Sequence, residues 1–545
     1  MQHNSKPTAE QICLDRHITL AAADAVMQGH LKVILHPVAK ERCEAAHARL
    51  QDAIADHALI YGLTTGFGPL ANRLVSQTHG QQLQQNLVHH LASGIGPAFD
   101  WVCARGLVLA RLMSILQGVS GASAQAITAL VAVLNSDLSP VIPSQGTVGA
   151  SGDLTPLAHM TLALQGRGQF QRRDGQVLDA AEALEHLQLP PLDLTRRDGL
   201  ALVNGTSAMT GVAVRTAALA GRTAHWAEAL SAVLAEVLQG RAEAWSTVFG
   251  AVRPHAGQQV TLQHLQTALS GSARVITAPL AQRKLAPDTQ TTEATAGQDA
   301  YTLRCVPQVI GAVRDTLSWH DSIVGTELCA ATDNPIFPAG ADAAALHGGN
   351  FMGQHVGLAS DALSNALTVL AGLAERQIAR LTDERLNGGL PAFLHEGTPG
   401  LNSGLMGAQV TATALLAEMR SVGAASIHSI STNGANQDVV SMGTIAARHA
   451  YAKVQTLAQV QAILAITVAQ AMDIIGPDNG FSPQAQSLHL FVRAYSARLN
   501  TDRPLGAEIS AMAQALQSQN PGVVNQNAST MPHPLSDHDK ADHTP

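Results

Sequence analysis

The segment from Val356 to Leu381 restricts the fold of this chain more than any other. Apolar residues recur in it at intervals of three and four positions without a break: Val356, Ala359, Leu363, Leu367, Leu370, Ala374, Ile378 and Leu381. This spacing places all of them on one side of a helix. The segment therefore predicts a single long helix with one buried face, and with it a fold made of long packed helices.

A second segment, Leu457 to Ile475, is apolar nearly all round and ends at Gly476-Pro477. Such a helix suits the centre of a bundle or a subunit interface. Polar residues interrupt it, which predicts a buried helix rather than a membrane span: Gln459, Gln461, Thr467, Gln470 and Asp473. Hydrophobic residues make up 46% of the chain and aromatic residues only 3%. An alanine- and leucine-rich composition of this kind favours helices over sheets, so a mainly α fold is predicted.

Charge and cysteine content exclude several classes of function. The formal net charge of -8 and the absence of a Lys/Arg-rich run argue against a nucleic-acid partner. The cysteines are odd in number and scattered, with no CxxC pair, which suits a reducing compartment. The first fourteen residues lack the apolar core of a signal peptide, so a cytoplasmic location is expected. No GxGxxG, Walker or HExxH motif occurs, and no metal is expected.

The stretch from Gly146 to Met160 carries the chemistry. Its tripeptide Ala150-Ser151-Gly152 has what a backbone needs to cyclise on itself. Gly152 offers an unhindered amide nitrogen on a backbone that bends sharply, and Ala150 leaves the attacked carbonyl uncrowded. The hydroxyl of Ser151 can leave as water, so closure with two dehydrations gives a methylidene-imidazolone, an electrophile that ordinary side chains do not supply. Asp153 follows as a candidate helper in proton transfer. A tight turn before a helix is the simpler interpretation of the same residues.

The full fifteen-residue string resembles the signature of the aromatic amino acid ammonia-lyases. These histidine, phenylalanine and tyrosine lyases carry a 4-methylidene-imidazol-5-one (MIO) group made from Ala-Ser-Gly. The resemblance implies that MIO forms here from Ala150, Ser151 and Gly152. It also implies that the tyrosine of the glycine-rich segment Tyr61 to Pro69 removes the β-proton of the substrate. A phenol acting as a base near neutral pH needs an electropositive, partly dry site.

Further motifs match the family in order from about residue 14 to residue 505. The resemblance assigns Arg304, in Gly297 to Arg304, to the substrate carboxylate as a bidentate fork. The resemblance also counts Tyr301 among the catalytic residues, with Tyr61 and Ser151. Tyr301 lies three positions before Arg304, so on a helix the two side chains share a face. Polar and aromatic matches supply the remaining substrate-facing residues: Asn204, Asn334, Phe351, Asn433, Asn436 and Gln437.

The pair His90-Leu91 indicates the substrate. At this pair phenylalanine lyases resemble Phe-Leu, histidine lyases Ser-His and tyrosine lyases His-Leu. An imidazole can hydrogen-bond a phenolic hydroxyl, and a buried polar group left unpaired by phenylalanine costs affinity. If the match to the family is shifted by one position, His89 takes the place of His90. The segment Asn86 to Gly94 resembles bacterial tyrosine lyases, so deamination of L-tyrosine to trans-p-coumarate and ammonia is expected.

The resemblance also implies quaternary structure. The family fold is an α-helical (aspartase-like) homotetramer whose sites mix three chains. Tyr61, His90 and the ring would then share a site with Tyr301 and Arg304 of a second subunit and Phe351 of a third. Alternatives left open are a phenylalanine or histidine lyase, an MIO-dependent tyrosine aminomutase, and a non-catalytic helical scaffold. No membrane partner is expected.

The sequence suggests four regions. A flexible N-terminus covers residues 1–13, and an N-terminal domain carrying the tripeptide covers 14–197. A long-helix scaffold covers 198–505, and a mostly disordered tail covers 506–545. Within the N-terminal domain, helices are predicted over Gln81–Ala92, Trp101–Gln117 and Ser123–Leu134. A small hairpin is predicted around Asp174-Gly175. Three tail histidines could bind a metal weakly, although a solvated tail is the simpler interpretation: His533, His538 and His543.

Overall fold

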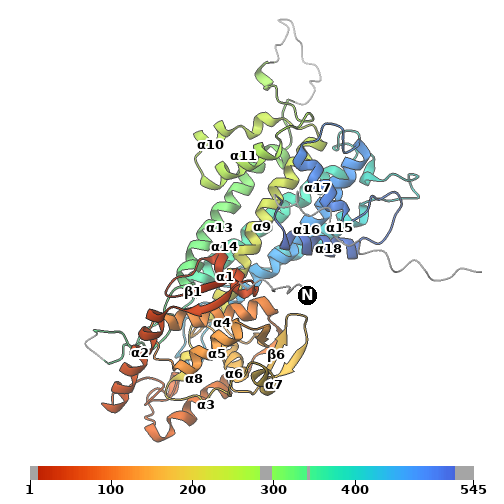
Figure 1. The fold of residues 1–545 in the computed structure, drawn as a ribbon. Coiled ribbons are helices and arrows are strands. Elements are labelled where there is room, and N and C mark those ends of the chain that lie inside the picture. The colour runs from red at the N-terminus through yellow and green to blue at the C-terminus, as the bar shows by residue number, and fades with distance from the viewer. Residues whose placement is uncertain (1–9, 283–296, 341–343, 522–545) are drawn as a thin grey trace, which may run out of the picture. The chain divides into compact units, whose positions relative to one another are not determined.

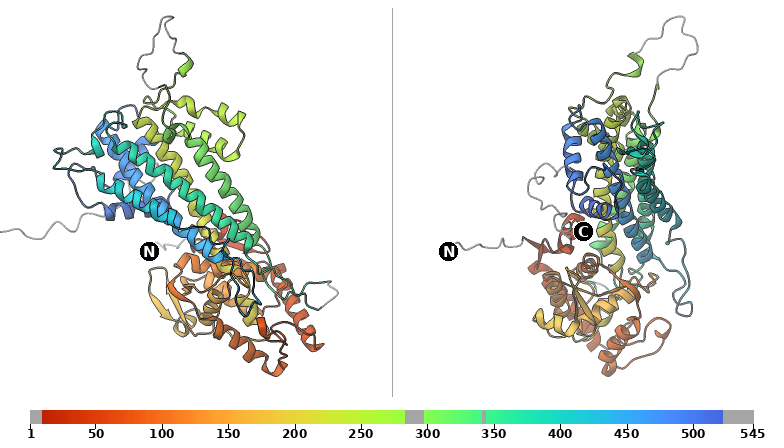
Figure 2. Two further views of the ribbon diagram at one scale, coloured as in Figure 1. Left: turned by 180° about the vertical axis from the view of Figure 1, so that it is seen from behind. Right: turned by 90° about the vertical axis from the view of Figure 1, so that its right-hand side faces the viewer.

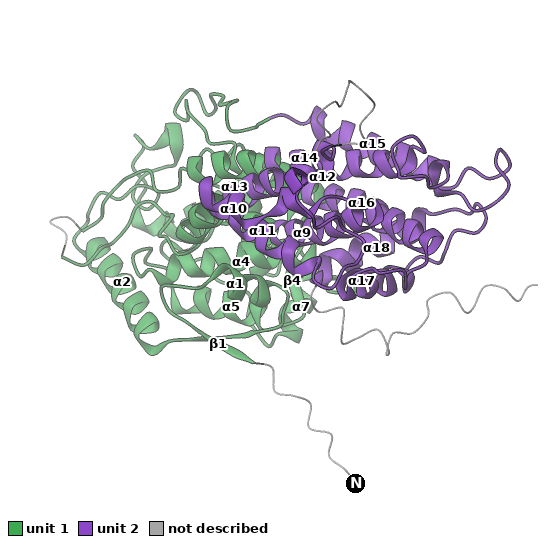
Figure 3. Ribbon diagram, turned by 90° about the horizontal axis from the view of Figure 1, so that it is seen from above, with its two compact units in different colours: residues 1–218, 318–364, 424–452 green, residues 219–317, 365–423, 453–545 purple. Residues whose placement is uncertain are grey.

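The structure is a computed structural model that describes residues 10–282, 297–340 and 344–521. It is mainly α-helical and divides into two compact units (Figure 3). Unit 1 comprises residues 1–218, 318–364 and 424–452, and unit 2 comprises residues 219–317, 365–423 and 453–545. Both units are therefore assembled from segments that lie far apart in the sequence.

Unit 1 holds all the strands of the described residues, together with the helices of the N-terminal part of the chain (Figure 1). Its helices are α1 (Leu20–Met27), α2 (Pro37–Ala55), α3 (Gly80–Leu91), α4 (Trp101–Leu116), α5 (Ala124–Leu134), α6 (Leu154–Leu164), α7 (Ala180–His186) and α8 (Asp198–Val203), with 3-10 turns η1 (Gly68–Leu70) and η2 (Gln77–His79). Its strands are β1 (Gln11–Leu14), β2 (Lys32–Leu35), β3 (Ile95–Ala98), β4 (Leu138–Pro140), β5 (Pro143–Gln145), β6 (Gln169–Arg172) and β7 (Val177–Asp179).

The strands of unit 1 form three small sheets. Strands β1 and β2 pair in parallel, and β3 and β5 pair antiparallel. Strands β4, β6 and β7 form an antiparallel sheet in that order, and Phe170 opposite Leu178 sets the register of β6 against β7. The hairpin predicted around Asp174-Gly175 is confirmed. Gly175 has φ +91°, a conformation that glycine adopts without strain.

Helix α4 is the centre of unit 1, and nearly all of it is buried. Its Arg105 is fully buried and donates to Met27 O at 2.9 Å and Leu134 O at 2.6 Å. These carbonyls lie at the ends of α1 and α5, where a helix leaves its last carbonyls without partners. A single guanidinium therefore joins three helices in the core.

Four of the five boundaries between the units fall within long helices: α9 (Ser207–Val237), α13 (Val306–Leu328), α14 (Gln354–Thr382) and α16 (Gly443–Ile475). The remaining elements of unit 2 are α10 (Thr247–Val252), α11 (Ala256–Ala268), α12 (Tyr301–Arg304), α15 (Met406–Ser421), α17 (Pro483–Arg493) and α18 (Gly506–Ser518), with 3-10 turns η3 (Ala242–Trp245), η4 (Leu280–Gln282) and η5 (Ala392–Leu394). The two predicted long helices are confirmed as parts of α14 and α16.

Within unit 2 the long helices run alongside one another, as Figure 2 shows from two sides. Buried polar side chains connect them. Gln377 of α14 donates to Ser231 Oγ of α9 at 2.9 Å, and Gln461 of α16 donates to Thr223 O of α9 at 2.8 Å. By length and composition α14 and α16 could each cross a membrane, but 67% and 78% of their most apolar windows are buried inside the protein. Burial of this extent is typical of core helices.

The structure corrects the predicted regions. The N-terminal segment was expected to be flexible through residue 13, yet Gln11–Leu14 forms β1 because it pairs with β2. The predicted tail begins with α18, which buries Ile509, Met512 and Leu516 at helical spacing. Residues 522–545, with the tail histidines, lie outside the described residues. The proposed boundary at 197/198 also differs, because the chain returns twice to unit 1 after residue 218.

Candidate active site

A cavity of about 630 Å³ in unit 1 gathers most of the predicted site residues. Its lining comes from segments spread over nearly 400 positions of the sequence, including the Tyr61 loop, α3, the tripeptide and the 433–437 turn. The predicted residues that line it are Tyr61, His90, Leu91, Ala150, Ser151, Asn204, Asn334, Phe351, Asn433, Asn436 and Gln437.

The Ala150-Ser151-Gly152 loop has a backbone that only small residues can adopt. Gly152 has φ +69°, and a Cβ added there would lie 2.1 Å from Gly205 O. Gly149 has φ +74°, and a Cβ added there would lie 2.2 Å from Ser441 Oγ. Both positions therefore require glycine, for conformation and for space.

Neighbouring segments hold this loop from several sides. Thr147 Oγ1 donates to Gly152 O at 3.2 Å, and Gly205 N donates to Ser151 O at 3.3 Å. A tight turn with little freedom brings its own backbone atoms together, as cyclisation of Ala150 onto Gly152 requires. Ser151 lines the cavity, so a methylidene formed from it would face the substrate space. The loop thus fits the MIO group that the resemblance implies.

Asp153 is fully buried next to the tripeptide. Its Oδ2 accepts from Met209 N at 2.8 Å in the first turn of α9, and its Oδ1 accepts from the hydroxyl of Thr444 in the first turn of α16. Burial raises the pKa of Asp153 to about 6, although these hydrogen bonds lower it. The carboxyl therefore titrates close to neutral pH while it caps a helix.

Tyr61 lies at the start of its loop with its hydroxyl directed back to the same loop. Gly68 N donates to Tyr61 Oη at 2.8 Å. The ring packs edge-on against Phe67 at 6.1 Å. The backbone N–H of Tyr61 donates to His347 Nε2 at 3.1 Å. This contact fixes the Tyr61 loop to the segment that follows the isolated β-bridge between Ile336 and Leu346.

His90 and Leu91 occupy the last turn of α3, on the cavity side. His90 Nδ1 lies 2.9 Å from Asn86 O. Because a carbonyl only accepts, this contact assigns the proton to Nδ1 and leaves Nε2 as an acceptor. The neighbouring His89 does not line the cavity, and its Nε2 lies 3.0 Å from Arg167 Nη1. Of the two candidates, His89 and His90, the structure therefore favours His90 as the residue that faces the cavity.

Asn204 is buried at the end of α8, and its amide nitrogen donates to Asp333 Oδ1 and to Asn334 O, both at 3.1 Å. Asp333 in turn forms a fully buried ion pair with Arg197 at 2.8 Å. Asn334 Oδ1 accepts from Gly348 N at 2.6 Å. These contacts fix Asn204 and Asn334 beside the cavity, because each buried polar group has a partner that determines its orientation.

The late polar motif forms a tight turn, with Asn433 at φ +50° and Ala435 at φ +63°. Gln437 Oε1 accepts from Asn433 Nδ2 at 2.7 Å, and Gln437 Nε2 lies 3.5 Å from Ser151 Oγ. Asparagine tolerates the left-handed conformation better than most residues do. The turn thus directs a carboxamide at the serine of the tripeptide.

Phe351 of this same chain lines the cavity. That a third subunit supplies Phe351 to each site stays a prediction, because the structure contains one chain.

Tyr301 and Arg304 are not brought to this cavity. Both lie on α12, in unit 2, where Arg304 lines a different cavity of about 350 Å³. The Arg304 guanidinium lies 4.9 Å from the centre of the Tyr301 ring, which confirms that the two side chains share a face. Arg304 also donates to Gln298 Oε1. Tyr301 is 70% exposed.

Sequence reasoning missed part of the cavity. Its apolar lining includes Leu87, Leu200 and Met352. Helical spacing could have identified two of them, because Leu87 lies three positions before His90 on α3 and Leu200 lies four positions before Asn204. His347 carried no such signal, since only the fold brings it to Tyr61.

The chain is similar to known proteins over nearly its whole length. The family model described as aromatic amino acid lyase matches residues 18–494. The chain is 59% identical over 519 residues to a tyrosine ammonia-lyase from Cereibacter sphaeroides, covering 95% of this chain and 98% of that one. It is 40% identical over 468 residues to an MIO-dependent tyrosine 2,3-aminomutase from Streptomyces globisporus, covering 84% of this chain and 85% of that one.

Similarity extends to solved structures. The crystal structure of the tyrosine aminomutase from Streptomyces globisporus superposes with a TM-score of 0.90 at 35% identity, covering 96% of this chain and 100% of that chain. The mainly α fold expected from the sequence is thus confirmed.

Proposed function

Because this chain belongs to the aromatic amino acid lyase family, we propose that it deaminates L-tyrosine without oxidation to trans-p-coumarate and ammonia. The observation that carries the proposal is the placement of Tyr61, His90 and Ser151 on one cavity. The similarity to a tyrosine ammonia-lyase over nearly the whole chain supports the same substrate.

The reaction breaks the Cα–N bond and removes a proton from Cβ, so that a Cα=Cβ double bond forms. The amine leaves poorly, and MIO formed from Ala150, Ser151 and Gly152 supplies an electrophile for it. Tyr61 Oη, as the phenolate, accepts the β-proton as the general base, and the Gly68 N–H holds that oxygen in place. The electron pair of the broken C–H bond becomes the double bond.

The other residues of the cavity hold the substrate. His90 Nε2 accepts from the phenolic hydroxyl, and Leu91 packs against the ring. Asn204, Asn433, Asn436 and Gln437 supply polar contacts around the reacting end, with Asn334 and Phe351 closing the cavity. Arg304 grips the carboxylate as a bidentate fork, with Tyr301 beside it, and both come from a second subunit of a homotetramer.

The free state of the cysteines fits the reducing environment of the cytoplasm. No membrane or nucleic-acid partner is part of the proposal.

The test supplies purified protein with L-tyrosine, L-phenylalanine and L-histidine separately and follows the ultraviolet absorbance of the conjugated acid that each would release. The fastest rise is expected with tyrosine. Faster release from either of the others would remove the tyrosine assignment. Chiral analysis for β-tyrosine separates the lyase from an aminomutase, which the 40% identical relative makes the second candidate.

Intact mass measured on the same sample tests the prosthetic group. A chain lighter by two waters has formed MIO, whereas a chain of full mass has not and would correspond to the scaffold alternative.

A further inference from the structure

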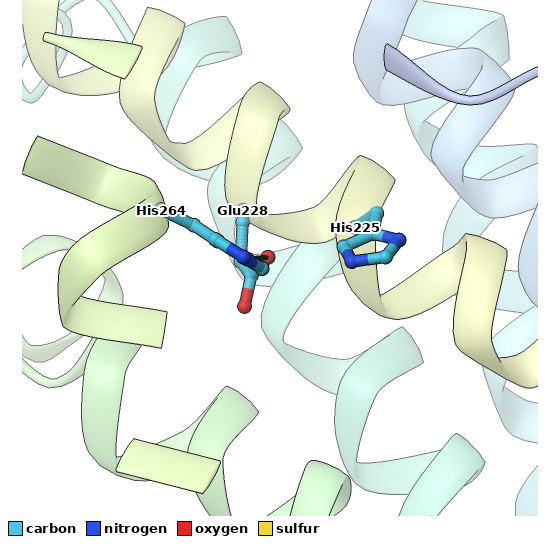
Figure 4. A group of neighbouring side chains, drawn as sticks. All are labelled: His225, Glu228 and His264. Atoms are coloured by element: carbon cyan, nitrogen blue, oxygen red, sulfur yellow. Dashed lines mark hydrogen bonds and ion pairs between the residues drawn. The ribbon is translucent and has the colours of Figure 1, made fainter. Parts of the chain in front are cut away.

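A cluster of metal-ligand residue types lies in unit 2, outside the cavity described above. His225 and Glu228 are three positions apart on α9 and therefore share a face. His264 reaches them from α11. Figure 4 shows the His264 ring and the Glu228 carboxylate side by side, with His225 further along α9. The catalytic proposal uses none of the three.

The spacing of the cluster suits one ion. One ligand atom from each residue lies within 4.8 Å of the others. His264 Nδ1 is 2.6 Å from Glu228 Oε2, and the two imidazole rings are 5.3 Å apart at a tilt of 50°. Glu228 is buried, whereas His225 is exposed and His264 partly exposed. A cation can thus enter from the histidine side and meet the carboxylate at the base.

Arg314 of α13 holds the carboxylate in place. Its Nε donates to Glu228 Oε1 at 2.6 Å and its Nη2 donates to Glu228 Oε2 at 2.7 Å. Carboxylates that bind metals are commonly oriented by such outer hydrogen bonds. Arg314 also balances the charge of Glu228, so the site carries no net negative charge. Its positive charge opposes a cation, and a readily exchanged ion is therefore expected.

We propose that His225, Glu228 and His264 bind one zinc ion, with water completing the coordination. Two imidazoles and one carboxylate form a ligand set that Zn²⁺ prefers. Coordination through His264 Nδ1 requires the proton between that nitrogen and Glu228 Oε2 to move to His264 Nε2 by exchange with solvent, so the imidazole stays neutral. The ion would connect α11 to α9 in unit 2. This inference is independent of the proposed lyase activity.

Calorimetric titration of the full chain with zinc chloride tests the site. One ion per chain is expected. The variant His225→Ala/His264→Ala should weaken binding by at least about tenfold, because loss of outer-shell partners alone costs 10- to 100-fold. Unchanged binding in that variant, or no binding by the parent chain, would overturn the proposal.

The tail histidines require a control of their own. In the triple variant His533→Ala/His538→Ala/His543→Ala, zinc binding at the proposed site should persist. Disappearance of the bound ion in this variant would assign it to the tail and overturn the proposal.

A measurement on the unaltered chain avoids any folding defect of the variants. Histidine modification by diethylpyrocarbonate, mapped by mass spectrometry, should be slowed by zinc at His225 and His264. The exposed His255, which follows α10, should be modified equally with and without zinc. Equal modification of all three histidines in both conditions would contradict the site.

Discussion

His90 has one ring nitrogen already engaged before any substrate arrives. Its Nδ1 donates to Asn86 O one turn earlier in α3, so Nε2 remains as an acceptor at the cavity. A phenolic hydroxyl can donate to that nitrogen, whereas a phenyl ring leaves it without a partner. Selection for tyrosine by this residue therefore depends on a backbone carbonyl as much as on the imidazole.

Replacing His90 by phenylalanine should lower the ratio of kcat/KM for tyrosine over phenylalanine by about 2- to 10-fold, the net effect of losing one hydrogen bond to an exposed side chain such as His90. Steady-state kinetics with both substrates measure it. The matched control is His89→Phe, which alters the adjacent residue on the same helix but not the cavity lining. An unchanged ratio in His90→Phe, or an equal change in the control, would remove His90 from the specificity argument.

Asp153 should make stability depend on pH. Burial raises its pKa from 3.8 to about 6, so the folded chain holds a proton between those values that the unfolded chain has lost. Its contribution is therefore most favourable at low pH and declines as pH rises through about 6. The full change corresponds to about 3 kcal/mol at most.

Asp153→Asn lacks this titration. Thermal unfolding midpoints measured from pH 4.5 to 7.5 should show the parent chain losing stability relative to the variant as pH rises. A constant difference between the two across this range would mean that Asp153 does not titrate there.

At the scale of elements, His347 anchors the loop that carries Tyr61. Its Nε2 accepts from Tyr61 N at 3.1 Å, and Gly348 N donates to Asn334 Oδ1 at 2.6 Å. Only neutral His347 can accept this hydrogen bond. Burial and Arg197 lower the pKa of His347, so the ring stays neutral to a lower pH than usual. The hydrogen bond from Tyr61 N to His347 is therefore lost as the pH falls through the lowered pKa of His347.

His347→Leu should lower kcat by about tenfold or more, because small displacements of a catalytic group are costly. His347→Gln keeps an acceptor and should restore most of the rate. The acid limb of the kcat/KM profile should also shift in both variants, since neither side chain titrates. If the leucine and glutamine variants lost activity equally, with the acid limb unmoved, a positioning role for His347 would be ruled out.

The sequence was sufficient where local pattern decides structure. Unbroken spacing predicted α14, and the Asp174-Gly175 turn predicted the β6–β7 hairpin. The sequence did not predict strand β1, because that strand depends on its pairing with β2 further along the chain. The tail helix α18 was a different failure, because Ile509, Met512 and Leu516 carry the same helical spacing in a short, alanine-rich segment.

The candidate site likewise contains some residues that the sequence predicted and others that it did not. Tyr61, His90 and Ser151 were predicted by their motifs and line one cavity. The anchors of these residues were not predictable, because Thr444 and His347 reach Asp153 and Tyr61 across nearly 300 positions. Neither anchor lies in a motif that sequence reasoning singled out.

At the scale of the whole molecule, the proposed carboxylate-binding residues belong to a different unit from the cavity. Tyr301 and Arg304 are in unit 2, whereas the residues lining the cavity are all in unit 1. If the site takes Arg304 from a second subunit, a chain without Tyr61 and a chain without Arg304 can repair each other. A mixed oligomer then contains sites with both residues intact.

Co-expression of Tyr61→Phe and Arg304→Gln chains tests this arrangement. Each variant alone should be nearly inactive. With equal amounts and random assembly, half of the cavities keep Tyr61 and half receive an intact Arg304, so about a quarter of the parent activity should return. The matched control pairs Tyr61→Phe with Ser151→Ala, whose residues line one cavity of one chain. No pairing of those chains gives an intact site, so activity should stay absent. No recovery in the test pair would place Arg304 in the site of its own chain. Recovery in the control would mean that Tyr61 and Ser151 of one chain do not serve the same site.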